Sequence, residues 1–164
     1  TDPLTGAANR RRFNDYIAAQ FDLAPLNGEP VSLLFLDVDH FKKFNDTYGH
    51  TTGDQILRET GQLFRRHCRQ HDVVARYAGD EFVVVLNELD EPRHAMTVAG
   101  RICTAVAAPF SIDGSIATLA ASVGIAYARP DDSADSLLNS AERVMYEATR
   151  QGGNRFVVSR PDAP

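Results

Sequence analysis

The chain has 164 residues, 43% of them apolar and 24% charged, which is the composition of one globular domain and excludes a disordered segment. Its net charge of −5 argues against a nucleic-acid polymer as partner, because a phosphate backbone is bound by a basic face. No apolar run approaches the ~20 residues that cross a bilayer, and no signal peptide opens the chain. We therefore expect a cytoplasmic domain that makes no membrane contact of its own.

The two cysteines, Cys68 and Cys103, each fall in a stretch with the periodicity of an amphipathic helix. Neither has a second cysteine or a histidine at metal-ligand spacing. Buried free thiols in a reducing compartment are the expectation.

The first half of the chain predicts a helix, a strand and two more helices. Residues 10–21 have the helical period, and their inner stripe is Phe13, Ile17 and Phe21. Residues 24–30 contain Pro, Asn-Gly and Pro, which predicts a loop. The apolar run at residues 31–38 predicts a central strand buried on both faces, followed by helices over about residues 40–47 and 52–69.

The second half begins with two strand-like runs that meet at Ala78-Gly79-Asp80-Glu81, a composition typical of a hairpin turn. A helix over residues 91–110, a strand over 117–128, a serine-capped helix over 133–153 and a short strand over 155–159 follow. A central hairpin excludes a strict doubly wound fold. The predicted class is α/β (α+β), with a mixed, largely antiparallel sheet flanked by helices in a palm or ferredoxin-like arrangement. Residues 1–160 form the predicted domain and 161–164 a frayed tail.

Two aspartates end the central strand. We expect Asp37 and Asp39 to face different surfaces, and for Asp39 capping of the following helix competes with catalysis. Asp37 ends an apolar strand, where a carboxylate is costly unless something pairs with it.

The hairpin turn supplies further acids. If the central strand neighbours the hairpin, Asp37, Asp80 and Glu81 crowd together, and two such charges ~4 Å apart repel by about 4 kcal/mol at an effective dielectric of 20. A bound cation relieves this repulsion. Oxygen ligands without His or Cys favour Mg²⁺, which joins one or two carboxylates to substrate phosphates.

Five spaced signatures extend this reading: TDPLTGAANRR, FLDVDHFKKFNDTYGHTTGD, RYAGDEFVVVL, SVGIAYA and GGNRF. In order and spacing they resemble the GGDEF domain of the diguanylate cyclase family, in an AGDEF variant. The resemblance implies condensation of two GTP molecules into cyclic di-GMP and two pyrophosphates, on a sheet like that of nucleotidyl cyclases and polymerase palms. It also implies Mg²⁺ (with Mn²⁺ as an alternative ion), a homodimer with opposed active sites, and an upstream sensory domain in a longer protein.

Position by position, the resemblance implies metal ligands at Asp37 and Asp80, with the Val38 carbonyl beside them. Glu81 matches the second acid of the motif, associated with the metal or with deprotonating the attacking hydroxyl. Asp80 and Glu81 are thus the catalytic candidates.

For GTP, the resemblance implies guanine recognition by Asn45 and Asp54, with Asp54 favouring GTP over ATP. Lys42 matches a phosphate contact, Phe41 belongs to the same substrate-binding set, and Gly79 leaves room for the nucleotide. Without the family, Asn45 and Asp54 are ordinary loop and cap residues and Lys42 is a solvated helix lysine.

Arg69 and Asp72 match the family's RxxD inhibitory site for cyclic di-GMP, and Arg101 aligns with a further arginine used there. The planar guanidinium group of arginine can bind phosphate oxygens and stack on a guanine ring. The alternative is a cation at a helix end followed by a turn acid.

The chain departs from the family pattern at three positions. Ala78 replaces the first glycine of the motif, which we expect to be tolerated. Thr149 and Gly153 stand where the last helix usually provides Lys and Arg for the phosphates, so we expect weaker GTP binding unless Arg150 or Arg155 substitutes.

Two alternatives to an active cyclase remain. One is an inactive domain acting as a receptor for cyclic di-GMP or GTP. The other is a receiver-like domain phosphorylated on Asp37, against which the hairpin argues.

Overall fold

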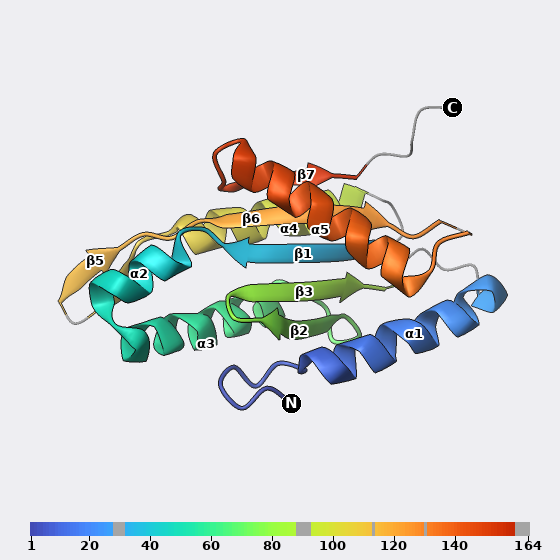
Figure 1. The fold of residues 1–164 in the computed structure, drawn as a ribbon, viewed down its shortest axis with the longest axis horizontal. Helices are drawn as coiled ribbons and strands as arrows, with labels where there is room; N and C mark the ends of the chain where they lie inside the picture. Colours follow the sequence, from blue (N-terminus) through green and yellow to red (C-terminus); the bar gives the residue numbers. More distant parts are fainter. Residues whose placement is uncertain (28–31, 88–92, 113, 130, 160–164) are drawn as a thin grey trace.

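A five-stranded mixed sheet forms the centre of the molecule in the computed structural model, which describes residues 1–27, 32–87, 93–112, 114–129 and 131–159 (Figure 1). Its strand order is β2-β3-β1-β6-β7. Their bounds are β1 Ser32–Val38, β2 Val73–Ala78, β3 Glu81–Leu86, β6 Ala121–Tyr127 and β7 Arg155–Val158. All neighbouring pairs are antiparallel except β6 with β7, so the predicted fold class is confirmed.

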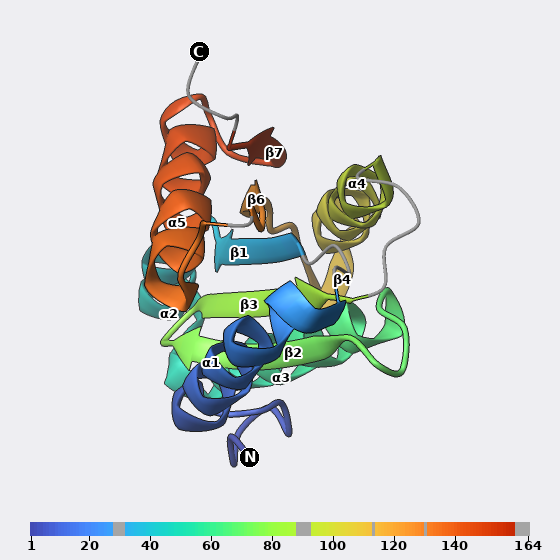
Figure 2. The same cartoon turned by 90° about the vertical axis from the view of Figure 1, so that its right-hand side faces the viewer.

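Helices cover both faces of the sheet, and Figure 2 shows α5 and α4 on opposite sides of it. The helices are α1 Arg10–Asn27, α2 Phe41–Tyr48, α3 His50–Arg66, α4 Arg93–Ala107 and α5 Ala134–Arg150. Alternate residues of β1 enter two separate cores. Leu34 and Leu36 pack with α3 and α4, whereas Leu33 and Phe35 pack with α1 and α5.

Several boundaries differ from the sequence predictions. Helix α1 continues to Asn27, so the predicted loop at 24–30 is wrong over its first half, where Leu23 and Ala24 favour helix; residues 28–31 lie outside the described part. Phe13 and Ile17 are buried as predicted, and the Phe21 side chain is not among those described. The serine cap of α5 is confirmed, because Ser133 and Ser136 form a reciprocal capping box.

The strand expected over 117–128 is split. Ala117 belongs to a small hairpin of β4 Phe110–Ile112 and β5 Ser115–Ala117, and β6 begins only at Ala121. The Asp-Gly pair between β4 and β5 is a hairpin signal that the sequence prediction overlooked.

Both cysteines are free thiols, as predicted, with Cys103 buried and Cys68 partly buried. Burial raises the pKa of the Cys103 thiol to about 11. Across the described ranges, no helix combines the length and the apolar character needed to span a bilayer.

Candidate functional site

The end of β1 and the β2–β3 turn lie side by side, as the sequence predicted. Asp37 is the cross-strand partner of Glu81, and the Val38 N–H donates to the Asp80 carbonyl at 3.3 Å. Ala78 pairs with Glu81 across the turn, and Gly79 has φ +36 with no atom within 4 Å of the position of a Cβ. The glycine is thus required by its left-handed backbone, and the space above it is open.

Asp37 is the most perturbed carboxyl group of this cluster. Its burial, a hydrogen bond with Asp80, and the charges of Asp80, Glu81 and Asp39 together raise the pKa of Asp37 to about 8. One of its oxygens, Oδ1, is buried without a hydrogen-bond partner among the described residues. A carboxylate left in this state is costly, and a cation at Oδ1 would satisfy it.

The donor set fits a magnesium ion that is completed by substrate. Within the part of the chain that the structure describes, no three His, Cys, Asp or Glu side chains form a ready-made metal cage. Asp37 and Asp80 provide two carboxylates, and Mg²⁺ commonly uses one or two together with substrate phosphates and waters.

Helix α5 adds two side chains that sequence reasoning missed. Burial and the neighbouring charges of Glu142 and Asp80 raise the pKa of Glu81, which Arg10 partly offsets. Tyr146 is 50% exposed. Partial burial raises the pKa of its hydroxyl most, and the negative charges of four carboxyl groups raise it further: Glu81, Glu142, Asp37 and Asp80. Glu142 and Tyr146 are four residues apart, a spacing that puts both on one helix face and could have drawn attention to them.

Asp39 does not cap α2, so that prediction is wrong. The N-cap is His40, in a left-handed conformation with φ 60 and no side-chain cap. Asp39 is only 7% exposed and accepts hydrogen bonds from Ser122 Oγ at 2.5 Å and from the Asn154 N–H at 2.9 Å. Ser122 is on β6, the strand next to β1, and Asn154 follows α5. The Asp39 carboxylate is therefore bound to these two residues and not to the first turn of α2.

The expectation that Asp37 and Asp39 face different surfaces is also wrong. Residues two apart on an extended strand share a face. Asp39 adds to the negative charge that raises the pKa of Asp37. Ser122, the cross-strand partner of Asp37, donates to Asp39, so the two carboxylates lie on the same face of the sheet.

The turn after α5 is built on Asp39. Gly152, Gly153 and Asn154 all have positive φ, at 117, 74 and 52. A Cβ on Gly153 would lie 2.4 Å from Asp39 Oδ2, so this position is reserved for glycine unless Asp39 moves.

Both candidate replacement cations make a contact within the described structure. Arg150 forms an ion pair with Glu147, and the Arg155 Nε donates to the Gly153 carbonyl at 3.0 Å. Thr149 donates to the Met145 carbonyl of its own helix at 3.3 Å. Each of the two arginines in residues 149–155 thus makes one contact close to its own position in the chain.

The predicted guanine residues lie on α2 and α3. Asn45 packs against Gly53, where a Cβ would lie 1.7 Å from Asn45 Oδ1, and this oxygen is buried without a partner among the described residues. Asp54 is exposed on the first turns of α3. At the start of α2, Phe41 is 8% exposed and stacks on Phe44, whereas Lys42 is exposed.

Arg76 connects the N-terminal segment to the β2–β3 turn. Its Nε donates to the Gly79 carbonyl at 2.9 Å, and its NH1 lies 3.4 Å from Asp2 Oδ1. Ala8 forms hydrogen bonds with Val74 and Arg76 along β2. The segment before α1 is thus attached to the strand that ends at Gly79.

Arg69 and Asp72 are brought together at the opposite end of β2, with Nε and Oδ2 3.8 Å apart. Asp72 is 3% exposed, and its carboxylate accepts from the N–H groups of Arg69 and Asn87. Asp72 therefore holds the turn itself. Arg101 is exposed on α4.

Three comparisons with known proteins agree on the family. The family model "Diguanylate cyclase, GGDEF domain" matches residues 1–155. The chain is 36% identical to the cyclic di-GMP phosphodiesterase NbdA of Pseudomonas aeruginosa, covering 93% of this chain and 20% of that protein. It is 38% identical to the diguanylate cyclase DosC of Escherichia coli, covering 94% of this chain and 34% of DosC.

Among solved structures, the GGDEF domain of DgcB from Caulobacter crescentus, in complex with c-di-GMP, superposes with a TM-score of 0.92 at 31% identity, covering 97% of this chain and 95% of that one. The chain spans only about a fifth to a third of the length of the curated relatives named above. The family match, in contrast, extends over nearly all of the chain. The chain belongs to the GGDEF domain family of diguanylate cyclases.

Proposed function

We propose that this domain is a diguanylate cyclase, which joins two GTP molecules into cyclic di-GMP and releases two pyrophosphates. The observation that supports it best is the Asp37–Asp80 pair, with a pKa of about 8 at Asp37 and an unpartnered buried oxygen at the same carboxyl group. Relatives named diguanylate cyclases support synthesis of cyclic di-GMP in general.

Asp37, Asp80 and the carbonyl of Val38 would hold Mg²⁺, or Mn²⁺ in its place. When bound, the ion neutralises the triphosphate and lowers the pKa of the attacking 3′-hydroxyl. Glu81, whose pKa is raised, would accept the proton from that hydroxyl.

The nucleotide would lie between the β2–β3 turn and α2. The first turn of α2, at Phe41 and Lys42, offers backbone N–H groups and one cation to the phosphates. Asn45 and Asp54 would read guanine, with the buried Asn45 Oδ1 as a candidate acceptor. Gly79 leaves the approach to the turn open.

One domain holds one GTP in this scheme, so two copies must face each other. The half-exposed Tyr146 beside the carboxylates would lie at this junction. We also propose that an upstream sensory domain controls whether two copies of this domain meet.

Product inhibition through the RxxD turn is a further part of the proposal. Because Asp72 is used to hold the turn, Arg69 and Arg101 would make the contacts to cyclic di-GMP. Arg101→Ala should relieve inhibition without changing the initial rate.

A receptor without catalytic activity is the second candidate. It is favoured by Thr149 and Gly153 and by the engagement of Arg150 and Arg155 within the fold. The name of the relative NbdA, a phosphodiesterase, is also compatible with a domain that does not synthesise the dinucleotide.

Purified chain incubated with GTP and Mg²⁺ separates the two. A cyclase forms cyclic di-GMP at a rate that Asp80→Asn lowers by about a thousandfold. A receptor forms none at any chain concentration, yet binds GTP or cyclic di-GMP in equilibrium dialysis.

A further inference from the structure

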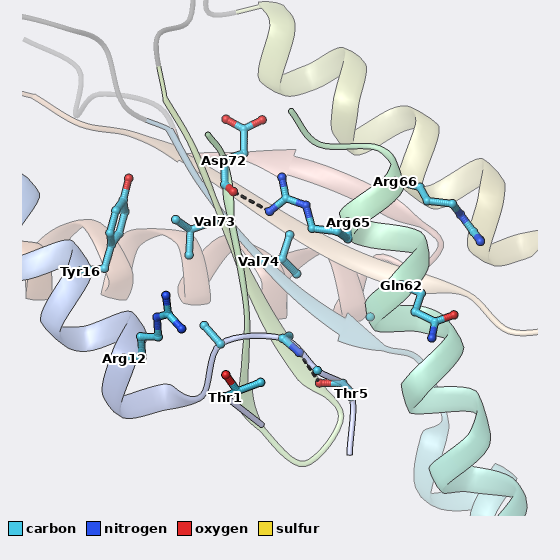
Figure 3. Close-up of a pocket in the computed structure, with 14 residues that line it drawn as sticks. Thr1, Thr5, Arg12, Tyr16, Gln62, Arg65, Arg66, Asp72, Val73 and Val74 are labelled. Carbon is cyan, nitrogen blue, oxygen red and sulfur yellow. Dashed lines mark hydrogen bonds between the residues drawn. The ribbon is translucent and has the colours of Figure 1, made fainter. Parts of the chain in front are cut away.

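A cavity of about 740 Å³ lies between the N-terminal segment, α1, α3 and the first residues of β2 (Figure 3). It adjoins Val73 and Val74, whereas the candidate catalytic turn follows Ala78 at the other end of the strand. Five residues of extended chain separate the two ends by roughly 17 Å. The cavity is therefore distinct from the acidic site, and its volume is that of a typical small-molecule site.

The cavity is basic in a chain whose net charge is −5. Three of its lining residues are Arg12, Arg65 and Arg66, and the one acid among them is Asp72. The Asp72 carboxylate is 1% exposed and lies 3.8 Å from the Arg69 guanidinium, which offsets its charge, so the three arginines leave the cavity net positive. This distribution favours an anion.

Two guanidinium groups flank the valine floor of the cavity (Figure 3). The Arg65 guanidinium is fixed by hydrogen bonds to the carbonyls of Asp72, at 2.6 Å, and Arg69. The Arg12 guanidinium has no hydrogen-bond or ion-pair partner among residues that the structure describes. The fixed guanidinium group of Arg65 and the unengaged one of Arg12 can together bind an oxyanion such as phosphate.

The walls are organised before any ligand binds. Asp2 accepts two hydrogen bonds from Thr5, and Thr5 lies 3.2 Å from the position that a Cβ on Gly61 would take. On the opposite side, the Tyr16 hydroxyl accepts from Asn87 Nδ2 at 2.7 Å. Fixed walls reduce the entropic cost of binding.

The floor is apolar and small. It is formed by Ala7, Ala8, Val73 and Val74. Tyr16 stands beside it as an aromatic wall, so a flat ring has a surface to contact. The cavity thus combines a phosphate position with room for an organic group.

We propose that this cavity binds a phosphorylated small molecule of nucleotide size. Its phosphate lies between Arg12 and Arg65, and its organic part covers the valine floor next to Tyr16. The proposal does not depend on cyclase activity, because none of these residues belongs to the carboxylate cluster.

The test is ¹⁵N-detected NMR titration of the chain in EDTA with three probes: GMP, inorganic phosphate and guanosine. GMP should shift the amides of Gly6, Ala8 and Val73, and leave those of Val38 and Gly79 in place. Phosphate should shift the same amides more weakly, and guanosine should require at least tenfold higher concentration than GMP.

Arg12→Gln should weaken GMP binding about tenfold, as expected for losing one charge-assisted hydrogen-bonding group. Arg11→Gln is the matched control, because it removes the same charge from an exposed neighbour on α1 that does not line the cavity, and it should change affinity less than twofold. The proposal is overturned if GMP shifts only Val38 and Gly79, if guanosine binds as well as GMP, or if both glutamine variants lose affinity equally. Absence of any shift at millimolar GMP also overturns it.

Discussion

The two ends of the candidate active site differ in how closely they follow the family pattern. At the β1 end, Asp37, Asp80 and Glu81 are present and gathered by sheet register. At the α5 end, Thr149 and Gly153 stand where the resemblance leads us to expect two cations, and the turn is folded onto Asp39. If the domain is a cyclase, changes at the two ends should therefore have different effects: metal-dependent turnover at the β1 end and GTP affinity at the α5 end.

The largest expected effect comes from the end that is intact. Asp80→Asn should lower kcat/KM by about a thousandfold, because it removes a cation ligand and charge from the reacting centre. The measurement is cyclic di-GMP formation at saturating Mg²⁺. Asp46→Asn, an exposed acid on α2, is the control and should stay within twofold of the parent chain.

The raised pKa of Asp37 makes stability depend on pH. The folded state binds the Asp37 proton more tightly than the unfolded state, so its contribution is complete below about pH 4 and is lost as pH rises through about 8. In EDTA at pH 8.5, Asp37→Asn should unfold with a free energy about 1–2 kcal/mol higher than the parent chain, a modest value because the group is half-buried.

Denaturant melts at pH 5 and pH 8.5, with EDTA or with Mg²⁺, check this expectation. Mg²⁺ should restore the parent chain at pH 8.5 and leave Asp37→Asn unchanged. A parent chain as stable at pH 8.5 in EDTA as at pH 5 would show that ionisation of Asp37 does not destabilise the fold.

At the other end of the site, adding a cation should help. Thr149→Lys should lower the KM for GTP about tenfold with little change in kcat, since one charge-assisted contact to the phosphates is gained. Gln151→Lys places the same charge on an exposed residue of the adjoining turn and is the control. An unchanged KM for Thr149→Lys would mean that the two ends of the site are not separable in this way.

Gly153→Arg is the less suitable replacement. Its Cβ must displace the Asp39 carboxylate, and its backbone must keep φ near +74. We expect a smaller gain in GTP affinity than from Thr149→Lys, with a loss of about 1 kcal/mol in the free energy of unfolding. A Gly153→Arg chain that is as stable as its parent and matches the KM of Thr149→Lys would contradict this.

The smallest expected effect concerns Asp39, which lies between the two ends of the site. Ser122→Ala removes one hydrogen bond from the buried Asp39 and should lower the free energy of unfolding by about 1 kcal/mol. Ser111→Ala, in the small β4–β5 hairpin, should change it by less than half as much. Equal losses in the two variants would show that the Asp39 hydrogen bond contributes nothing particular.

Sequence periodicity was sufficient to predict the central strand at 31–38 and the Gly-Asp hairpin. It placed Asp37 next to Asp80 only on the condition that this strand neighbours the hairpin, as the pairing of β1 with β3 now shows. It was not sufficient for Asp39, whose partners Ser122 and Asn154 are 83 and 115 residues away. Such contacts depend on tertiary packing, and no local pattern reveals them.

The same limit applied to the RxxD turn and to α5. The motif identified Arg69 and Asp72, but only the fold shows that Asp72 is consumed by backbone N–H groups. Tyr146 could have been flagged from its spacing to Glu142, yet its proximity to Asp37 depends on how α5 packs on β1.

The most direct test of the central proposal is the initial rate of cyclic di-GMP formation measured across chain concentration, with GTP and Mg²⁺ in excess. If each domain holds one GTP and two domains must meet, the rate should rise with the square of chain concentration at low concentration and become linear once dimers saturate. Cyclic di-GMP formation that stays strictly linear down to the lowest concentration, or that is absent throughout, would contradict the account.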